Sequence, residues 1–187
     1  YTAAYSTPAT NNVDAPLHST YTPVDFLHHR KREAMDSTIQ TYVDHLDSLR
    51  ERIKETIQDL TAEDLNWSPS LTETNSAYIL ATHIAGSESM WVHEIIGGID
   101  VKRDRDSEFQ AKGTTTNELV KRIESTAEIS RKILSGLTRA DLEQSRKEPF
   151  RRGGGDISVH GCLLRILEHT SEHLGHLELT KQLLKQR

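Results

Sequence analysis

The chain has 187 residues, 35% of them hydrophobic, and its 28 acidic and 23 basic residues give a formal net charge of −5 at pH 7. Nucleic acid and anionic membrane surfaces are therefore excluded as main partners, because phosphate groups bind to basic surfaces. No apolar run approaches the roughly 18 residues of a membrane-spanning helix, and the single cysteine, Cys162, cannot form an internal disulfide, which favours a reducing compartment, the cytoplasm.

Residues 1–35 differ in composition from the rest of the chain. They are rich in Thr, Ala, Pro and Asn and carry no sustained hydrophobic period. Such a segment cannot bury enough apolar surface to form a core of its own. We therefore expect an N-terminal tail over residues 1–35 and one domain over residues 36–187. The first residue is Tyr1 rather than Met, which leaves open the removal of a preceding signal peptide.

The pattern becomes helical from Ile39 onward. Apolar residues recur at intervals of three and four within four segments, residues 39–60, 76–96, 115–137 and 157–187. No segment shows the alternation of polar and apolar residues that is typical of strands. The sequence therefore predicts an all-α fold, a four-helix bundle preceded by the irregular tail.

Short capping motifs support these helix boundaries. "LTAEDL" (60–65) and "LTRADL" (137–142) each follow a long helix and offer a Thr as the N-cap of a short helical turn. The repeated order of helix, capped turn, linker and helix suggests two helical hairpins that pack together. Thr115 and Glu118 match a capping box at the start of the third helix.

Ten histidines are the compositional excess with chemical meaning. His169, His173 and His176 are spaced by four and three residues, so they lie within a narrow sector of the last helix. A histidine pair at i, i+4 can bind one metal ion, because its side chains lie one turn apart on one face. The other interpretation is that these histidines are partly buried and hydrogen-bonded to neighbouring helices.

His83 lies among apolar residues in "YILATHIAG", where a lone imidazole needs a polar partner. That partner is either a hydroxyl in the core or a metal ion shared with the last helix. His160 lies nine residues before His169 and faces away from it. His93 lies about 15 Å along the helix from His83, too far to share one ion.

Two longer segments carry a family resemblance. "SAYILATHIAGSESMWVHEIIGG" and "ILEHTSEHLGHLELTKQLL" resemble the DinB-like superfamily of metal-binding four-helix bundles, over roughly residues 36–187. The resemblance implies that the metal ligands are His83, His169 and His173. His176 occupies a position where many members have Gln, so we expect it to contact the ligand residues without binding the metal itself. Related bundles pair, which implies a homodimer.

The resemblance also implies a function. Three neutral imidazoles leave at least one open position on a divalent transition metal such as zinc, nickel or iron, which is the catalytic rather than the structural pattern. We expect a metal-dependent enzyme that transfers or isomerises groups of a small-molecule substrate with a low-molecular-weight thiol as cosubstrate. One alternative is a metal-dependent hydrolase with a water nucleophile. Another is a metal-binding bundle without catalytic activity.

No general base can be identified from the sequence. Glu172 points about 100° away from the neighbouring ligand and is expected to orient other groups. Arg165 lies one turn before His169 and either holds an anionic substrate group or is an ordinary exposed arginine. Arg103 and Arg105 in "RDRDSEF" are interpreted as solvated loop charges.

Overall fold

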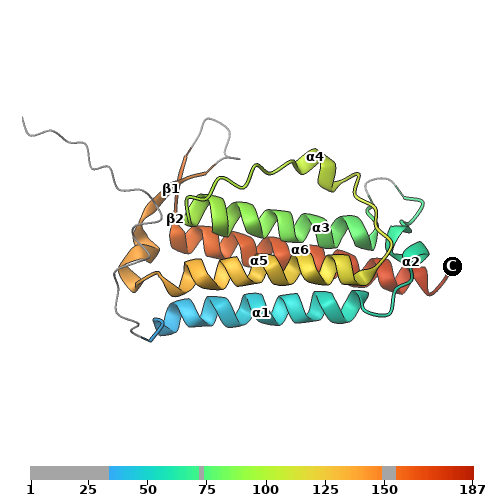
Figure 1. The fold of residues 1–187 in the computed structure, drawn as a ribbon, viewed down its shortest axis with the longest axis horizontal. Coiled ribbons are helices and arrows are strands. Elements are labelled where there is room, and N and C mark those ends of the chain that lie inside the picture. The colour runs from blue at the N-terminus through green and yellow to red at the C-terminus, as the bar shows by residue number, and fades with distance from the viewer. Residues whose placement is uncertain (1–33, 72–73, 149–154) are drawn as a thin grey trace, which may run out of the picture.

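The computed structural model describes residues 34–71, 74–148 and 155–187 (Figure 1). Four long helical segments run side by side and confirm the predicted all-α four-helix bundle. They are α1 (Ser37–Ile57), α3 (Ala77–Glu88) with its π-helical continuation η2 (Ser89–Ile96), α5 (Thr116–Ser135) and α6 (Val159–Leu184). Of the predicted tail, residues 1–33 lie outside the described residues, so the division at residue 35 stays a prediction.

The helices do not pack in simple chain order. α1 packs mainly against α5 and α6, and α3 packs against the same two helices. α1 and α3 therefore stand at opposite corners of the bundle, as do α5 and α6. Because α3 and α6 are neighbours, side chains from the second and the last long helix meet directly.

Short elements connect the long helices. They are α2 (Ala62–Asn66), α4 (Arg105–Glu108), the 3-10 helix η3 (Arg139–Glu143) and the strands β1 (Ser145–Lys147) and β2 (Asp156–Ser158). The two strands pair antiparallel and form the one sheet among the described residues, which the sequence pattern did not predict. Three-residue strands are too short to show an alternating pattern. α4 lies against α3 on the outside of the bundle (Figure 1).

The structure confirms the two caps predicted from the repeated motif and contradicts the capping box predicted at α5. Thr61 and Thr138 are the N-cap residues of α2 and η3, as the repeated motif predicts, and each forms a capping box, with Asp64 and with Asp141 respectively. The predicted box at α5 is wrong. Thr115 is the N-cap residue there, but its side chain makes no capping hydrogen bond. The Glu118 carboxylate instead accepts from the hydroxyls of Thr114 (3.3 Å) and Tyr78 (3.1 Å).

The bundle interior is divided into two apolar clusters. One lies toward the β-strands and includes Leu46, Val92, Leu134 and Ile166, and the other includes Ile53, Ile84, Ile123 and Leu174. Each long helical segment carries a buried polar residue between the members of the two clusters. These residues are Arg50, Glu88, Ser130 and Thr170.

Three members of this polar layer are linked by hydrogen bonds across the core, whereas the buried Thr170 hydroxyl has no hydrogen-bond partner among the described residues. Arg50 on α1 donates through Nε to Glu88 on α3 (3.1 Å) and through Nη2 to the other carboxylate oxygen. The hydroxyl of Ser130 on α5 also donates to Glu88. His93 completes the layer, with Nε2 3.1 Å from the Ser130 hydroxyl. A buried charge pair with these extra hydrogen bonds satisfies groups that would otherwise destabilise the core.

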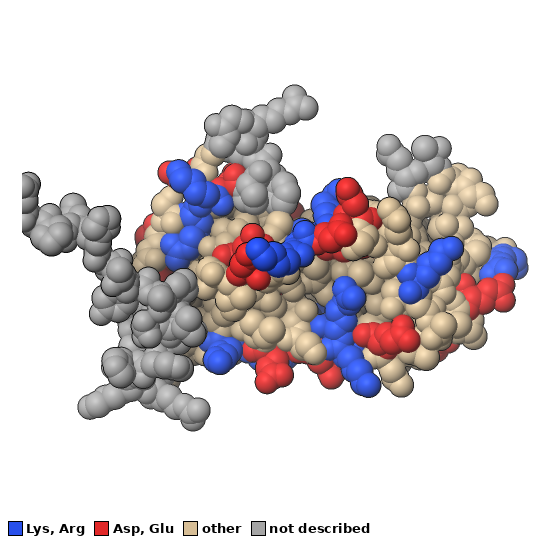
Figure 2. Space-filling model, turned by 45° about the horizontal axis from the view of Figure 1, so that its top comes forward, with Lys and Arg blue, Asp and Glu red and all other residues tan. Residues whose placement is uncertain are grey.

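The outer surface carries charges of both signs. Figure 2 shows basic and acidic side chains interspersed on one face, without a broad area of either sign. Within the described residues, no helix has both the length and the apolar character needed to cross a membrane.

Candidate metal centre

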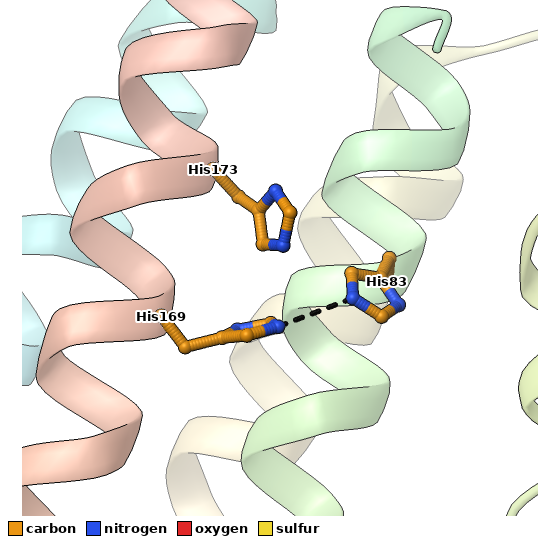
Figure 3. Close-up of side chains that lie close together, drawn as sticks. All are labelled: His83, His169 and His173. Atoms are coloured by element: carbon orange, nitrogen blue, oxygen red, sulfur yellow. Dashed lines mark hydrogen bonds between the residues drawn. The ribbon is translucent and has the colours of Figure 1, made fainter. Parts of the chain in front are cut away.

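Three imidazoles converge between α3 and α6 (Figure 3). His83 comes from the middle of α3, whereas His169 and His173 come from successive turns of α6. Because the two helices pack against each other, the i, i+4 pair on α6 faces His83 across the interface. One ring nitrogen from each of these residues lies within 4.8 Å of the other two. We call His83, His169 and His173 the histidine triad.

The spacing within the triad fits a shared dication. The Nε2 atoms of His83 and His169 are 3.2 Å apart. Two nitrogens on one tetrahedral zinc ion, each about 2.0–2.1 Å from it, would be separated by about 3.3 Å, so these two rings need little adjustment. The donor set of three imidazoles also suits nickel and iron.

A carboxylate orients the His83 ring. Oε2 of Glu108, at the end of α4, lies 2.8 Å from Nδ1 of His83. Arg103 donates to both oxygens of Glu108, through Nε (2.7 Å) and Nη2 (2.8 Å). A His83 ring that donates its Nδ1 hydrogen to this carboxylate would direct the lone pair of Nε2 at the other triad rings, as in many carboxylate–histidine–metal arrangements.

Sequence reasoning missed Glu108 and misjudged Arg103. We expected Arg103 to be a solvated loop charge, but only 11% of its side chain is exposed and it pairs with Glu108. Gly86 of α3 leaves the space that this contact needs, because an added Cβ at this position would lie 2.1 Å from Oε1 of Glu108. The glycine lets the carboxylate come close to the α3 backbone and so reach His83.

The triad histidines on α6 are neutral at physiological pH. Burial lowers the pKa of His169 to about 3, and repulsion from His173 and His83 adds to the shift. Burial also lowers the pKa of His173 to about 4, with His83 adding to the effect. Burial alone would raise the pKa of Glu108, but the hydrogen bonds from Arg103 and His83 outweigh it and lower the pKa. The site thus offers lone pairs on nitrogen beside an ionised carboxylate.

The remaining predicted site residues surround the triad. Nδ1 of His176 lies 3.4 Å from Nδ1 of His173, but His176 is exposed to solvent. Arg165 and Glu172 line a cavity next to the triad, and Arg165 pairs there with Glu168 (3.0 Å). The structure therefore brings all three residues to the site without placing any of them among the three converging rings.

The cavity has a volume of about 320 Å³ and opens to solvent beside His83 and His169. Its other lining residues are Ser87, Met90, Trp91, Arg103, Arg105, Arg165, Glu168 and Glu172. Met90 and Trp91 belong to η2, the π-helical segment that continues α3. Wide turns of this kind are frequent at functional sites, and here the turn contributes the apolar part of the wall.

Two other histidines lie apart from the triad. His93 is buried, and its Nε2 lies 3.1 Å from the carbonyl oxygen of Thr126 and from the Ser130 hydroxyl. The His160 ring contacts Tyr42 edge-on, with 5.6 Å between the ring centres. Neither belongs to the group of side chains that could hold a metal ion in the described part of the chain.

Comparison with known proteins gives one family and a structural neighbour. Residues 41–186 match the family described as mycothiol-S-transferase. A crystal structure of a conserved protein from Enterococcus faecalis has a similar fold, with a TM-score of 0.64, 15% sequence identity, and coverage of 82% of this chain and 100% of that chain. At this identity the likeness concerns the fold alone. No curated protein matches the chain.

Proposed function

Because the chain belongs to the mycothiol-S-transferase family, a DinB-like family, we propose that it is a metal-dependent transferase that joins the sulfur of mycothiol to an electrophilic small molecule. The observation that carries the proposal is the convergence of three imidazoles at the edge of an open cavity. His83, His169 and His173 would hold the dication and leave a position open toward the cavity. A bound dication would favour deprotonation of a thiol at neutral pH.

The chain's own cysteine does not suit the role of nucleophile. Cys162, the single cysteine of the sequence, is buried in the core. Burial raises the pKa of its thiol to about 11, so it carries a proton at neutral pH. The reacting sulfur must therefore come from a second molecule, in agreement with a thiol cosubstrate.

The protein groups around the triad would orient and bind rather than react. Glu108 would orient the His83 ring through its contact with Nδ1, and Arg103 would hold Glu108 in place. A cavity of about 320 Å³ is large enough for a small molecule, and Trp91 and Met90 give it an apolar wall against which an organic acceptor would pack.

The test is an activity screen on metal-loaded protein with mycothiol, bacillithiol, glutathione or no thiol. We expect product only when a thiol is present, with mycothiol the best, and we expect no activity in His169→Ala. His160→Ala serves as the matched control on the same helix. Product formed without thiol would instead support the hydrolase alternative. Stoichiometric metal without turnover of any acceptor would support the non-catalytic bundle.

A further inference from the structure

We infer that the cavity beside the triad contains an anion subsite built on Arg105, which binds a carboxylate on the acceptor molecule. The inference rests on the proposed function, because the acceptor is the second substrate of the transferase. Three guanidinium groups line the cavity, those of Arg103, Arg105 and Arg165.

Two of these guanidinium groups already have carboxylate partners. Arg103 directs one edge at Glu108 through Nε and Nη2. Arg165 donates through Nη1 to Glu168, one turn further along α6. The charge of each arginine is already offset by a neighbouring carboxylate, so neither arginine is the first choice for binding an external anion.

Arg105 differs from both. Its guanidinium lies over the ring of Phe109, with Cζ 4.6 Å from the ring centre. This contact uses the face of the guanidinium and leaves its N–H groups, which lie in the plane, free to donate. These N–H groups form no hydrogen bond or ion pair within the described residues. A stacked guanidinium with open edges is well prepared for two-point binding of a carboxylate.

The position of Arg105 relates the subsite to the metal centre. The Phe109 ring lies 4.8 Å from the ring of His83, so one aromatic ring separates the guanidinium from a triad histidine. Across the cavity, Glu172 is a carboxylate without an ion pair in the described part of the chain. Its repulsion would keep an anionic group away from α6 and direct it toward Arg105.

Arg105 also lines a neighbouring cavity. A second cavity of about 490 Å³ shares Met90, Arg103 and Arg105 with the first and is also lined by Lys102 and Lys147. Its acidic lining residues are Glu94 and Asp100. Arg105 thus stands at the boundary of the two cavities, where an acceptor can place its carboxylate while its electrophilic carbon stays in the cavity of the triad.

The kinetic test compares two acceptors that differ by one carboxylate. Metal-loaded protein and mycothiol are assayed with benzyl chloride and with 4-(chloromethyl)benzoate. In each reaction a C–S bond forms as the C–Cl bond breaks, chloride leaves with the bonding electrons, and the thiol proton goes to solvent. In Arg105→Gln, KM for the carboxylated acceptor should rise about tenfold or more, with KM for benzyl chloride unchanged.

Two further variants sharpen the comparison. Arg105→Lys keeps the charge but loses the planar fork, so its KM for the carboxylated acceptor should lie between those of the parent and Arg105→Gln. Arg122→Gln removes an exposed arginine from α5 and should change neither KM. An Arg105→Gln variant whose KM values both stay unchanged, or both rise equally, would overturn the subsite.

A binding measurement separates this inference from the proposed function. Calorimetric titration of 4-(hydroxymethyl)benzoate and benzyl alcohol into metal-loaded protein requires no turnover. We expect the benzoate alone to bind, and about tenfold or more weaker binding in Arg105→Gln. Arg105-dependent binding without thiol transfer would leave the subsite standing and reject the transferase. Thiol transfer with no Arg105-dependent binding would reject the subsite and leave the transferase standing.

Discussion

The Nδ1 atom of His83 lies 2.8 Å from Oε2 of Glu108, although the two residues belong to different helices and are 25 positions apart. Arg103 donates through Nη2 to the same carboxylate oxygen, and this nitrogen lies 3.4 Å from Nδ1 of His83. The connection between α3 and α5 therefore does more than join two helices. It carries the groups that set the orientation of one candidate ligand.

We predict that Glu108→Gln weakens metal binding about 10- to 100-fold while leaving the fold intact, because the His83 ring loses its charged orienting partner. Competition with a chromophoric chelator measures the affinity, and circular dichroism checks the helix content. Glu118→Gln on α5 is the matched control, since its exposed carboxylate contacts Tyr78 and Thr114 instead. Equal affinities for the parent and Glu108→Gln would refute the orienting role.

The ligand set gives a second prediction. His169→Ala or His173→Ala should abolish stoichiometric metal binding, because each removes one of only three converging nitrogens. His160→Ala, nine residues before His169 on the same helix, should bind metal like the parent protein. Elemental analysis after dialysis against a weak chelator distinguishes them. An equal loss from His160→Ala would mean that the angular assignment of α6 is wrong.

Most of the bundle could be predicted from the sequence because long helices repeat their core residues many times. Ile39, Leu46 and Ile53 are all buried on α1, as their spacing predicts. The resemblance of the chain to the DinB-like superfamily is confirmed by the family match. The π-helical turn from Ser89 to Ile96 was not anticipated, because a change of hydrogen-bond register leaves little trace in a hydrophobic pattern.

The surroundings of the triad were less predictable. His169 and His173 are four residues apart, so they lie on one face of any helix and could be paired from the sequence alone. The pairing of Glu108 with Arg103 and His83 depends on how the α4 connection folds back onto α3, and in the sequence "RDRDSEF" is only a run of mixed charges. Gly86 was a usable signal, because a glycine one turn after a core histidine indicates a close approach by another group.

The polar layer in the core gives a third prediction, on stability. Glu88→Gln should lower the free energy of unfolding by about 3 kcal/mol, because it removes the buried carboxylate that Arg50 contacts and leaves the Arg50 charge paired with the half-buried Asp47. The double variant Arg50→Met/Glu88→Leu should cost much less than the sum of the single changes. Arg131→Ala, which removes a partly exposed pair with Asp47, should cost about 1 kcal/mol or less.

Urea titrations of these variants measure the differences. Additive losses in the double variant would show that Arg50 and Glu88 contribute independently. In that case the two hydrogen bonds between them are not the main reason that both side chains are buried in the layer between the two apolar clusters.

A fourth prediction concerns pH. In the metal-free protein the pKa values of His169 and His173 are about 3 and about 4, whereas both are near 6.5 in an unfolded chain. The folded state therefore binds fewer protons between these limits, so its stability is fully present above pH 6.5 and falls as the pH decreases toward 3. Each histidine adds a slope of at most about 1.4 kcal/mol per pH unit.

The variant His169→Leu should reduce this slope, since it removes one of the two triad histidines on α6 whose pKa values are lowered. His45→Ala, at an exposed position on α1, is the control and should keep the parent slope. Unfolding free energies of the metal-free proteins at pH 7, 6 and 5 provide the comparison. Parallel curves for the parent and His169→Leu would contradict the assignment.

The last prediction is that chelation leaves the helices intact. The two apolar clusters contain no triad histidine and draw on every long helix, so the core forms without an ion. A structural metal with a closed shell would instead be a major part of the folding free energy, and its removal would unfold the domain. We expect the chelated protein to keep its far-ultraviolet dichroism, with a melting temperature lowered only by the lost binding free energy, which grows with the logarithm of the metal concentration.

Two measurements decide between the two roles of the metal. Dichroism before and after chelation tests whether the helices need the ion, and a metal-bound crystal structure gives the number of protein ligands. Wholesale loss of helix, or His176 as a fourth protein ligand, would assign the ion to folding. Retained helix with three protein ligands would leave the fourth position for a cosubstrate, which is what thiol transfer at the triad requires.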